Sequence, residues 1–325
     1  MPKARFDIVT VGDCKADHFV KLDDYKILKV RGGAPKLVLP FGKKIPVTGF
    51  HFFCGGNSLN SAVTFARLGL RPAVLTTLGG DTEGSHILEK MRAEKISVEL
   101  VSIEKNSETD KSLILVAGGE RTIFGYHCEK RYKFPSDLST DWVYLTSLGS
   151  EFLSVYKAVG RGIRRKRFRL AYNPGTRQLL DSLAEVRRMI KHADLLFVNL
   201  QEAQTITASR TADAKKLLAG LRGLGAEVAV ITDGSRGAYA SDGARFLKIP
   251  AFPAKRVDAT GAGDAFASAF TAAIIRGQSI AEALRWGSVN AAGEISQIGV
   301  HNGLCYKAQL LQALRKSPRF VAKSF

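Results

Sequence analysis

The sequence predicts an α/β protein, a three-layer sandwich with a mostly parallel central sheet and a small discontinuous β lid. Two observations support this fold class. Short apolar runs rich in β-branched residues alternate with amphipathic stretches, which is the pattern of parallel strands joined by covering helices. Two segments of extended character, which contain Gly or Pro, interrupt that alternation. The chain has 325 residues, enough to bury a core without disulfide support.

The individual elements follow from these patterns in chain order. Apolar runs predict strands at 6–11, 73–78, 142–145, 168–172, 195–198 and 228–232. Helical spacing of apolar residues predicts helices at 58–68, 83–94, 179–192 and 212–224. No repeat or low-complexity linker divides the chain, so we expect residues 1–325 to form one domain.

The two interrupting segments are residues 25–53 and 111–127. The first carries several Gly and Pro residues, and the second is a predicted hairpin that turns at Gly118-Gly119-Glu120. We expect both to form a lid over the carboxyl ends of the strands, where open α/β sheets bind ligands. The alternative is a pair of unrelated surface hairpins.

The charge balance is strongly basic. Lys and Arg number 48 against 30 acidic residues, a formal net charge of +18. Such a field attracts polyanions and phosphorylated metabolites, but it does not determine a fold. The densest basic run, residues 161–169, is either a solvated helix end or a nucleic-acid patch, and no aromatic stacking platform accompanies it.

Cysteine usage and hydropathy indicate the setting. The four cysteines are far apart, so neither a zinc cluster nor a disulfide framework is expected. The first residues lack the apolar core of a signal peptide, and no apolar stretch approaches the roughly 20 residues of a membrane helix. We therefore expect a soluble, cytoplasmic protein that does not enter a membrane.

The strongest chemical signal is the segment 256–266, a glycine-rich turn that runs into an apolar helix. The backbone amides of Gly261, Ala262 and Gly263 can converge at the positive end of that helix and bind an anion. Asp264 beside them can take a proton from an attacking hydroxyl, as phosphoryl transfer requires. The alternative is that Asp264 only caps the helix. The pattern is neither a Walker loop nor the dinucleotide fingerprint, because Phe266 stands where the third glycine belongs.

Two further segments carry possible ligand-binding residues. Gly55 and Gly56 begin a helix, where a ligand can approach the backbone, and Asn60 lies one turn further along. An ordinary turn and a polar helix residue would explain them equally. Residues 232–237 follow a strand and suit either a nucleotide loop or a hairpin turn.

Together these segments resemble the ribokinase family, also called the PfkB-type carbohydrate kinases, over nearly the whole chain and in the expected order. The resemblance implies a ribokinase-like sandwich and an ATP- and Mg²⁺-dependent kinase. It implies that Asp264 is the base and that the amides of Gly261 to Gly263 form the anion hole. The substrate-binding positions it implies are Asp17, Gly55, Gly56 and Asn60.

The same resemblance implies the remaining ligand contacts. Asn199 and Glu202 match an N-x-x-E motif that organises Mg²⁺, through water, and the phosphates. The nucleotide positions are Asn199, Thr232, Gly234, Ser235, Gly237 and Ser288. Asp258 and Thr260 match a site for a monovalent cation such as K⁺, which many members have.

Three departures from the family pattern affect the substrate. Ala259 replaces a threonine of the carboxyl-terminal signature, and Asn57 replaces a lysine that members acting on sugar phosphates often carry. The second change argues against a phosphofructokinase-like substrate. Gly149 lies near a position where ribokinase itself has a substrate-binding glutamate, which weakens the case for ribose.

We therefore expect a kinase that transfers the γ-phosphate of ATP to a hydroxymethyl group of a sugar. A nucleoside kinase of the same family is the alternative. A more distant alternative is a nucleic-acid-binding protein on a kinase-like scaffold, although the intact motifs argue against nucleic acid as a partner. Exposed strand edges in 25–53 would allow a homodimer through the lid.

Overall fold

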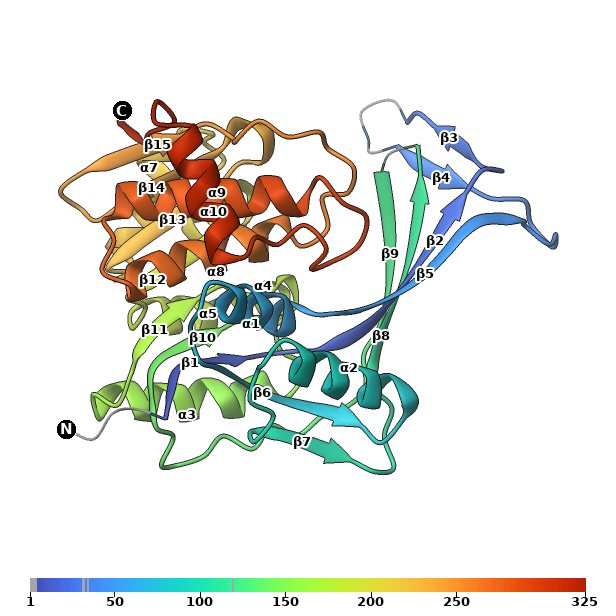
Figure 1. Cartoon of the computed structure of the whole chain (residues 1–325), viewed down its shortest axis with the longest axis horizontal. Helices are drawn as coiled ribbons and strands as arrows, with labels where there is room; N and C mark the ends of the chain where they lie inside the picture. The colour runs from blue at the N-terminus through green and yellow to red at the C-terminus, as the bar shows by residue number, and fades with distance from the viewer. Residues whose placement is uncertain (1–4, 31–32, 34, 119) are drawn as a thin grey trace.

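The computed structural model describes residues 5–30, 33, 35–118 and 120–325. Within these residues, one large sheet has the strand order β16-β15-β14-β13-β12-β11-β10-β1-β6-β7 (Figure 1). From β7 to β13 all neighbours are parallel, whereas β14, β15 and β16 are antiparallel. The strands are β1 (Phe6–Val11), β6 (Pro72–Gly79), β7 (Val101–Glu104), β10 (Thr140–Leu145), β11 (Arg169–Tyr172), β12 (Leu195–Asn199), β13 (Val228–Thr232), β14 (Ala238–Ser241), β15 (Phe246–Ile249) and β16 (Lys323–Ser324).

The strands form because their apolar side chains are buried on both faces of the sheet. Successive side chains of a strand point to opposite faces, and in β10 Trp142 and Tyr144 pack into one hydrophobic core while Val143 and Leu145 pack into the other. The mostly parallel sheet predicted from the continuous apolar runs is confirmed.

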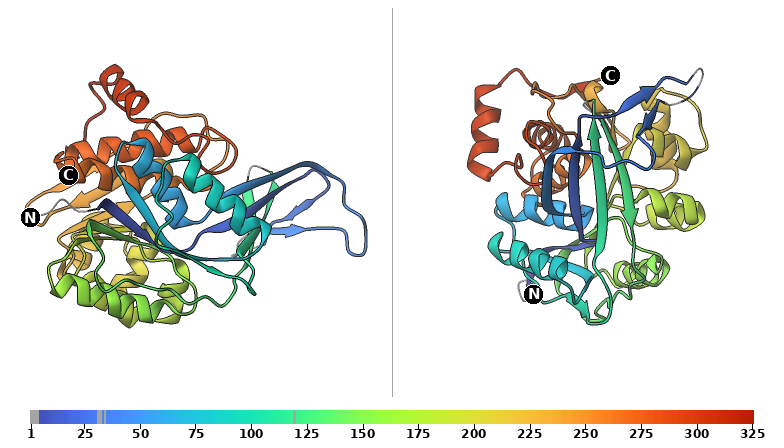
Figure 2. Two further views of the ribbon diagram at one scale, coloured as in Figure 1. Left: turned by 60° about the horizontal axis from the view of Figure 1, so that its bottom comes forward. Right: turned by 90° about the vertical axis from the view of Figure 1, so that its right-hand side faces the viewer.

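Helices cover both faces, as Figure 2 shows in its right-hand view. The helices on one face are α1 (Asn57–Arg67), α2 (Thr82–Ala93), α8 (Ala262–Ile275), α9 (Ile280–Glu294) and α10 (Lys307–Lys316). Those on the other are α3 (Phe152–Arg164), α4 (Thr176–Asp181), α5 (Leu183–Ile190), α6 (Leu200–Thr207) and α7 (Ala214–Gly223). The single helix expected at 179–192 is wrong, because the backbone leaves the helical region at Ser182 (φ −158°).

A second, smaller sheet projects from one end of the sandwich (Figure 1). Its order is β5-β2-β8-β9, from β2 (Lys15–Leu22), β5 (Val47–Gly55), β8 (Asp110–Ala117) and β9 (Glu120–Tyr126). A separate hairpin of β3 (Lys26–Leu28) and β4 (Lys36–Val38) lies beyond it. We refer to these strands as the lid. The predicted lid segments omitted β2, which follows β1 after a break of only residues 12–14.

Two sequence predictions fall partly outside the described residues. Gly119 of the predicted hairpin turn and Met1 to Ala4 of the amino terminus are not described. Among the helices of the described residues, none combines the length and the apolar character needed to cross a membrane.

Candidate functional site

Two cavities lie side by side near the N-terminus of α8. The first, of 290 Å³, brings together the predicted substrate and catalytic residues Asp17, Gly56, Asn60 and Asp264 with residues of the lid. The second, of 540 Å³, is lined by Thr232, Gly234, Ser235, Gly237 and Ser288, among others. Both cavities include Ala259, Ala262 and Gly263, so they meet at the start of α8. We call them the acceptor cavity and the nucleotide cavity, after the ligands that the sequence predicts for their lining residues.

The turn before α8 exposes backbone amides where the cavities meet. Gly261 is the N-cap residue with a φ of +77°, a left-handed conformation that favours glycine. The first amides of a helix have no intrahelical acceptor, although that of Ala262 makes a long bond to Ala259 O at 3.4 Å. A Cβ at Gly263 would meet no atom within 4 Å, so the space beside this first-turn residue is open. The helix start can therefore bind an anion.

Asp264 occupies the first turn of α8 at the floor of the acceptor cavity. Its side chain is buried, and its Oδ2 accepts a hydrogen bond of 2.9 Å from Asn60 Nδ2. Burial raises its pKa to about 7, while the Asn60 hydrogen bond and the positive charge of Lys15 act in the opposite direction. A carboxyl group with such a pKa is suited to accept a proton near neutral pH.

A second layer of buried polar groups holds Asn60. Its Oδ1 lies 2.8 Å from His301 Nε2, and since burial lowers the pKa of His301 to about 3, the neutral ring donates this hydrogen bond. The His301 amide donates to Glu294 Oε1 at 3.0 Å, and Arg67 Nη1 donates to the His301 carbonyl at 2.6 Å. The Asn60 amide is thereby fixed with its N–H groups toward Asp264.

His301 and Glu294 were missed in the sequence. His301 is 241 residues from Asn60 and has no metal-ligand or nucleophile spacing around it, so no local pattern marks it. Its left-handed φ of +79°, unusual for a residue other than glycine, is visible only in the structure.

Asp17 faces the acceptor cavity from the lid strand β2 rather than from the end of β1. Its carboxylate lies against Gly55, where a Cβ would come within 2.0 Å of Asp17 Oδ2, so a larger residue would displace the carboxylate. Asp17 Oδ1 and the neighbouring Ser112 Oγ are buried and make no hydrogen bond of normal geometry among the described residues, although Ser112 lies close enough to lower the pKa of Asp17. Unpaired buried oxygens of this kind favour a ligand with hydroxyl groups.

The nucleotide loop joins β13 to β14 through the short helix Gly234–Arg236. Gly237 (φ +96°) closes the turn so tightly that a Cβ would lie 2.0 Å from Ile249 O. Ser288 reaches the same cavity from α9.

Asn199 and Glu202 form a reciprocal capping box at the start of α6. Asn199 Oδ1 accepts from the Glu202 amide at 2.9 Å, and Glu202 Oε2 accepts from the Asn199 amide at 2.8 Å. Burial raises the pKa of Glu202, and its charge in turn raises that of Asp264. Neither residue lines the two cavities, so the structure gives both a capping role and places the Glu202 charge within electrostatic reach of Asp264.

Asp258 organises the loop before α8. Its Oδ1 accepts from the amide and the hydroxyl of Thr260 at 2.9 and 2.7 Å, and its Oδ2 accepts from the Gly299 amide at 3.2 Å. Gly149 donates its amide to Tyr132 and does not line the acceptor cavity.

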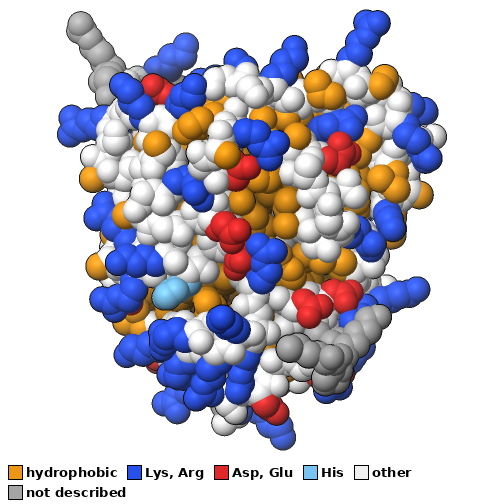
Figure 3. All heavy atoms as spheres, turned by 90° about the vertical axis from the view of Figure 1, so that its left-hand side faces the viewer, with side chains coloured by type: hydrophobic (Ala, Val, Ile, Leu, Met, Phe, Trp, Pro, Cys, Tyr) orange, Lys and Arg blue, Asp and Glu red, His pale blue; other side chains and the backbone are white. Residues whose placement is uncertain are grey.

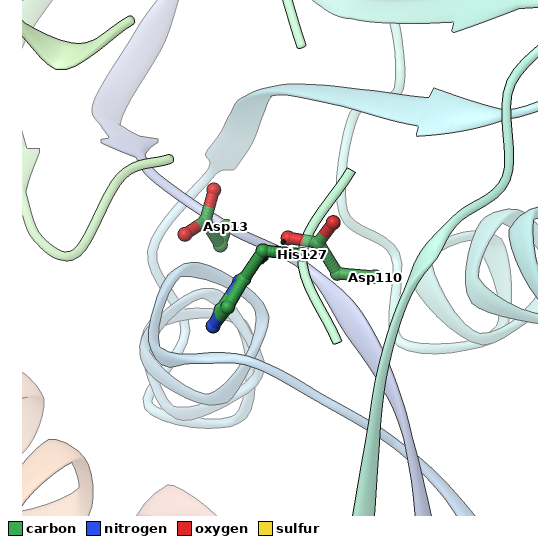
Figure 4. A group of neighbouring side chains, drawn as sticks. All are labelled: Asp13, Asp110 and His127. Carbon is green, nitrogen blue, oxygen red and sulfur yellow. Dashed lines mark hydrogen bonds and ion pairs between the residues drawn. The ribbon is translucent and has the colours of Figure 1, made fainter. Parts of the chain in front are cut away.

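A cluster of charged groups lies where the lid leaves the main sheet (Figure 4). Asp13 follows β1, Asp110 begins β8 and His127 follows β9, with one ligand atom of each within 4.8 Å of the others. The buried Lys130 ammonium lies 2.8 Å from Asp110 Oδ1, and Tyr132 donates its hydroxyl to Asp13. The protein thus supplies its own cation to these carboxylates.

Known proteins resemble this chain along most of its length. The family model described as pfkB family carbohydrate kinase matches residues 20–305. A nucleoside kinase of Methanothermobacter thermautotrophicus is 25% identical over 92% of each chain, and a ribokinase of Bacillus subtilis is 25% identical over 92% of this chain and 96% of its own. The structure of Arabidopsis thaliana ribokinase complexed with ribose and ATP superimposes with a TM-score of 0.76 at 21% identity, over 95% of this chain and 99% of that one.

Proposed function

Because the chain belongs to the pfkB family of carbohydrate kinases, we propose that it transfers the γ-phosphate of ATP to a hydroxymethyl group of a sugar. Membership of this family makes it a phosphotransferase with an alcohol group as acceptor. One observation carries this proposal: Asp264 and the open amides of α8 lie where the acceptor and nucleotide cavities meet. The ATP bound to the Arabidopsis ribokinase supports ATP as the donor.

In the proposed reaction the acceptor oxygen attacks the γ-phosphorus. The bond from the γ-phosphorus to the leaving oxygen of ADP breaks, and the hydroxyl proton passes to Asp264 Oδ1, since Oδ2 accepts from Asn60. The amides of Gly261, Ala262 and Gly263 stabilise the charge that grows on the transferred group. Asp17 and Asn60 hold the acceptor hydroxyls, and closure of the lid excludes water as a competing acceptor.

Magnesium is proposed at the start of α6, outside the lining of the two cavities, where the Glu202 carboxylate is within electrostatic reach of Asp264. The ion prefers carboxylate oxygens and water, and Glu202 Oε1 makes no hydrogen bond to the described residues. Glu202, with Asn199, would hold Mg²⁺ through water. The ion would neutralise the phosphates.

A monovalent cation is proposed at Asp258 and Thr260. The amides of Thr260 and Gly299 donate to the Asp258 carboxylate and so fix it beside α8, where its oxygens would be the ligands. Addition of K⁺ in place of a tetraalkylammonium ion should raise turnover, and equal turnover with both would contradict the site.

A nucleoside acceptor is the second candidate, since the nucleoside kinase and the ribokinase are equally similar to this chain. ADP release across pentoses, hexoses, 2-keto-3-deoxy sugars and nucleosides distinguishes the two. Selective turnover of nucleosides would replace the sugar in our proposal.

Replacement of the base tests the mechanism. Asp264→Asn should lower kcat by about 10²-fold or more, while ATP binding measured by calorimetry stays near that of the wild type. Wild-type turnover in this variant would show that Asp264 is not the base.

The lid is proposed to pair two copies of the chain. Its edge strands are β5 and β9, and it exposes the apolar side chains Ile27, Leu28, Phe41, Phe50, Ile123 and Phe124. Light scattering on the purified protein should give twice the mass of one chain. The Phe50→Glu variant should lower the measured mass toward that of a single chain.

A further inference from the structure

We propose that the acceptor carries an anionic group, a phosphate or a carboxylate, which Lys15 and Arg121 bind in the acceptor cavity. This inference rests on the proposed kinase function and goes beyond it by naming the chemical class of the acceptor.

Lys15 is a cation without a partner inside the cavity. It begins β2, two residues before Asp17, so both side chains leave the same face of the strand. It is half-buried, yet no described residue forms a hydrogen bond or ion pair with its ammonium group. Its positive charge lowers the pKa of both Asp17 and Asp264, which line the same cavity. A partly desolvated lysine with free donors is suited to an anion.

Arg121 supplies a second cation, from strand β9 of the same lid sheet. It lies near the start of β9, and its Nη2 reaches to 3.5 Å from Ala259 O on the loop before α8. Beside it, Glu120 pairs with Arg256 at 3.3 Å. Arg121 thus lines the acceptor cavity from the start of β9, at an exposed position.

The positions of the two cations favour the acceptor over ATP as their ligand. Both line the acceptor cavity, and neither lines the nucleotide cavity. The transferred phosphate belongs where the cavities share Ala259, Ala262 and Gly263. Asn57, which stands where members acting on sugar phosphates often carry a lysine, also lines the acceptor cavity. Its side chain is neutral, so Lys15 and Arg121 would supply the positive charge that the lysine provides in those members.

Charge balance explains why two cations are needed. An anionic acceptor must approach both ATP and the carboxylates of Asp17 and Asp264, which is repulsive in a partly buried site. A neutral sugar needs only hydroxyl-binding groups, which Asp17, Ser112 and Asn60 already provide.

The test compares acceptors that differ only in the anionic group and keep a free hydroxymethyl group. Methyl ribofuranoside is paired with ribose 1-phosphate, and glucitol with gluconate, so the two pairs separate phosphate from carboxylate. ADP release gives kcat/KM for each. At least one anionic member should exceed its neutral partner by about tenfold or more, as a charge-assisted contact provides.

Variants assign that preference to Lys15. Lys15→Gln should reduce the anionic-to-neutral ratio of kcat/KM about tenfold with the KM for ATP unchanged within twofold, and Lys15→Arg should retain most of the ratio. Lys21→Gln is the matched control, because it removes the same charge from an exposed position of the same strand. Thermal melts confirm that each variant is folded.

Three outcomes would overturn the proposal. Preference for the neutral member of both pairs contradicts the anion site alone. A rise in the KM for ATP in Lys15→Gln, equal for all acceptors, assigns Lys15 to the donor phosphate. No ADP release with any acceptor contradicts the kinase function itself, and the anion site with it.

Discussion

At the scale of single residues, Asp264 combines reactivity with a cost in stability. Its pKa is about 7 in the folded protein against 3.8 for an ordinary aspartate, so the folded state retains the proton to higher pH than the unfolded state. The burial cost is therefore fully felt above pH 7 and is relieved as the pH falls below it. The charged form that costs stability is the form that accepts a proton.

The pH dependence of activity should report this carboxyl. Because only the deprotonated form acts as a base, kcat/KM should rise about tenfold per pH unit below 7 and level off above it. A rate profile measured from pH 5 to 9 checks this. A profile already flat at pH 5 would contradict the raised pKa.

His301 should act on the rate through Asn60. In His301→Leu the Asn60 amide loses the donor that fixes it, so its hydrogen bond to Asp264 weakens and the pKa of Asp264 rises. We expect kcat to fall about tenfold, with the acidic limb of the profile moved to higher pH.

His301→Gln is the control, because its amide can donate to the same oxygen. Both variants disturb a buried residue with a left-handed backbone, so both should lose stability. Only the leucine variant should move the pH profile, and an equal shift in both would make His301 merely structural.

At the scale of elements, the function depends on how α8 begins. Gly261 adopts φ +77° at one end of this helix and Gly277 adopts φ +74° just past the other. A Cβ at Gly261 would lie 3.1 Å from Glu294 Oε1, whereas one at Gly277 would meet nothing within 4 Å.

The two glycines form a matched pair of substitutions. Gly261→Ala and Gly277→Ala should each lower the free energy of unfolding by about 1 kcal/mol, because alanine disfavours this backbone conformation. Only Gly261→Ala should also reduce turnover, since it alters the amides that bind the phosphate. Equal turnover in both, measured alongside denaturant melts, would exclude the helix start from the anion hole.

Sequence reasoning predicted the elements that depend on local patterns. Apolar runs such as Val228–Thr232 matched their strands, and the residues of the nucleotide loop line one cavity as expected. It missed β2 of the lid sheet, because only residues 12–14 separate this strand from β1 of the main sheet. It also missed the helix break at Ser182, because no Gly or Pro marks that position. The roles of His301 and Lys15 arise from contacts between distant segments, which spacing along the chain does not encode.

At the scale of the whole molecule, the net charge of +18 lies largely away from the chemistry. Arg161, Arg164, Arg165, Lys166 and Arg167 are exposed at the end of α3, remote from the lid. Figure 3 shows the face opposite the lid, with Lys and Arg side chains gathered along its lower edge. These side chains suit a solvated surface.

The dependence of the rate on ionic strength should separate long-range attraction of ATP by the surface charge from direct contacts in the site. If the surface charge draws ATP toward the cleft, kcat/KM for ATP should fall as NaCl rises from 0.05 to about 0.5 M while kcat changes little, since salt screens charges beyond about 10 Å at 0.1 M. Arg164→Gln combined with Arg165→Gln should reduce that salt dependence only slightly. A steep loss of kcat itself would instead indicate a disrupted site.

The wall of shared residues between the two cavities has a consequence for inhibitor design. Ala259, Ala262 and Gly263 carry small or absent side chains, so the residues that both cavities share leave room between them. One molecule that tethers an adenosine moiety to a sugar through a phosphate chain would place both ends at once. Once one end of this molecule is bound in its cavity, the other end would be held near the second cavity at an effective concentration on the order of millimolar.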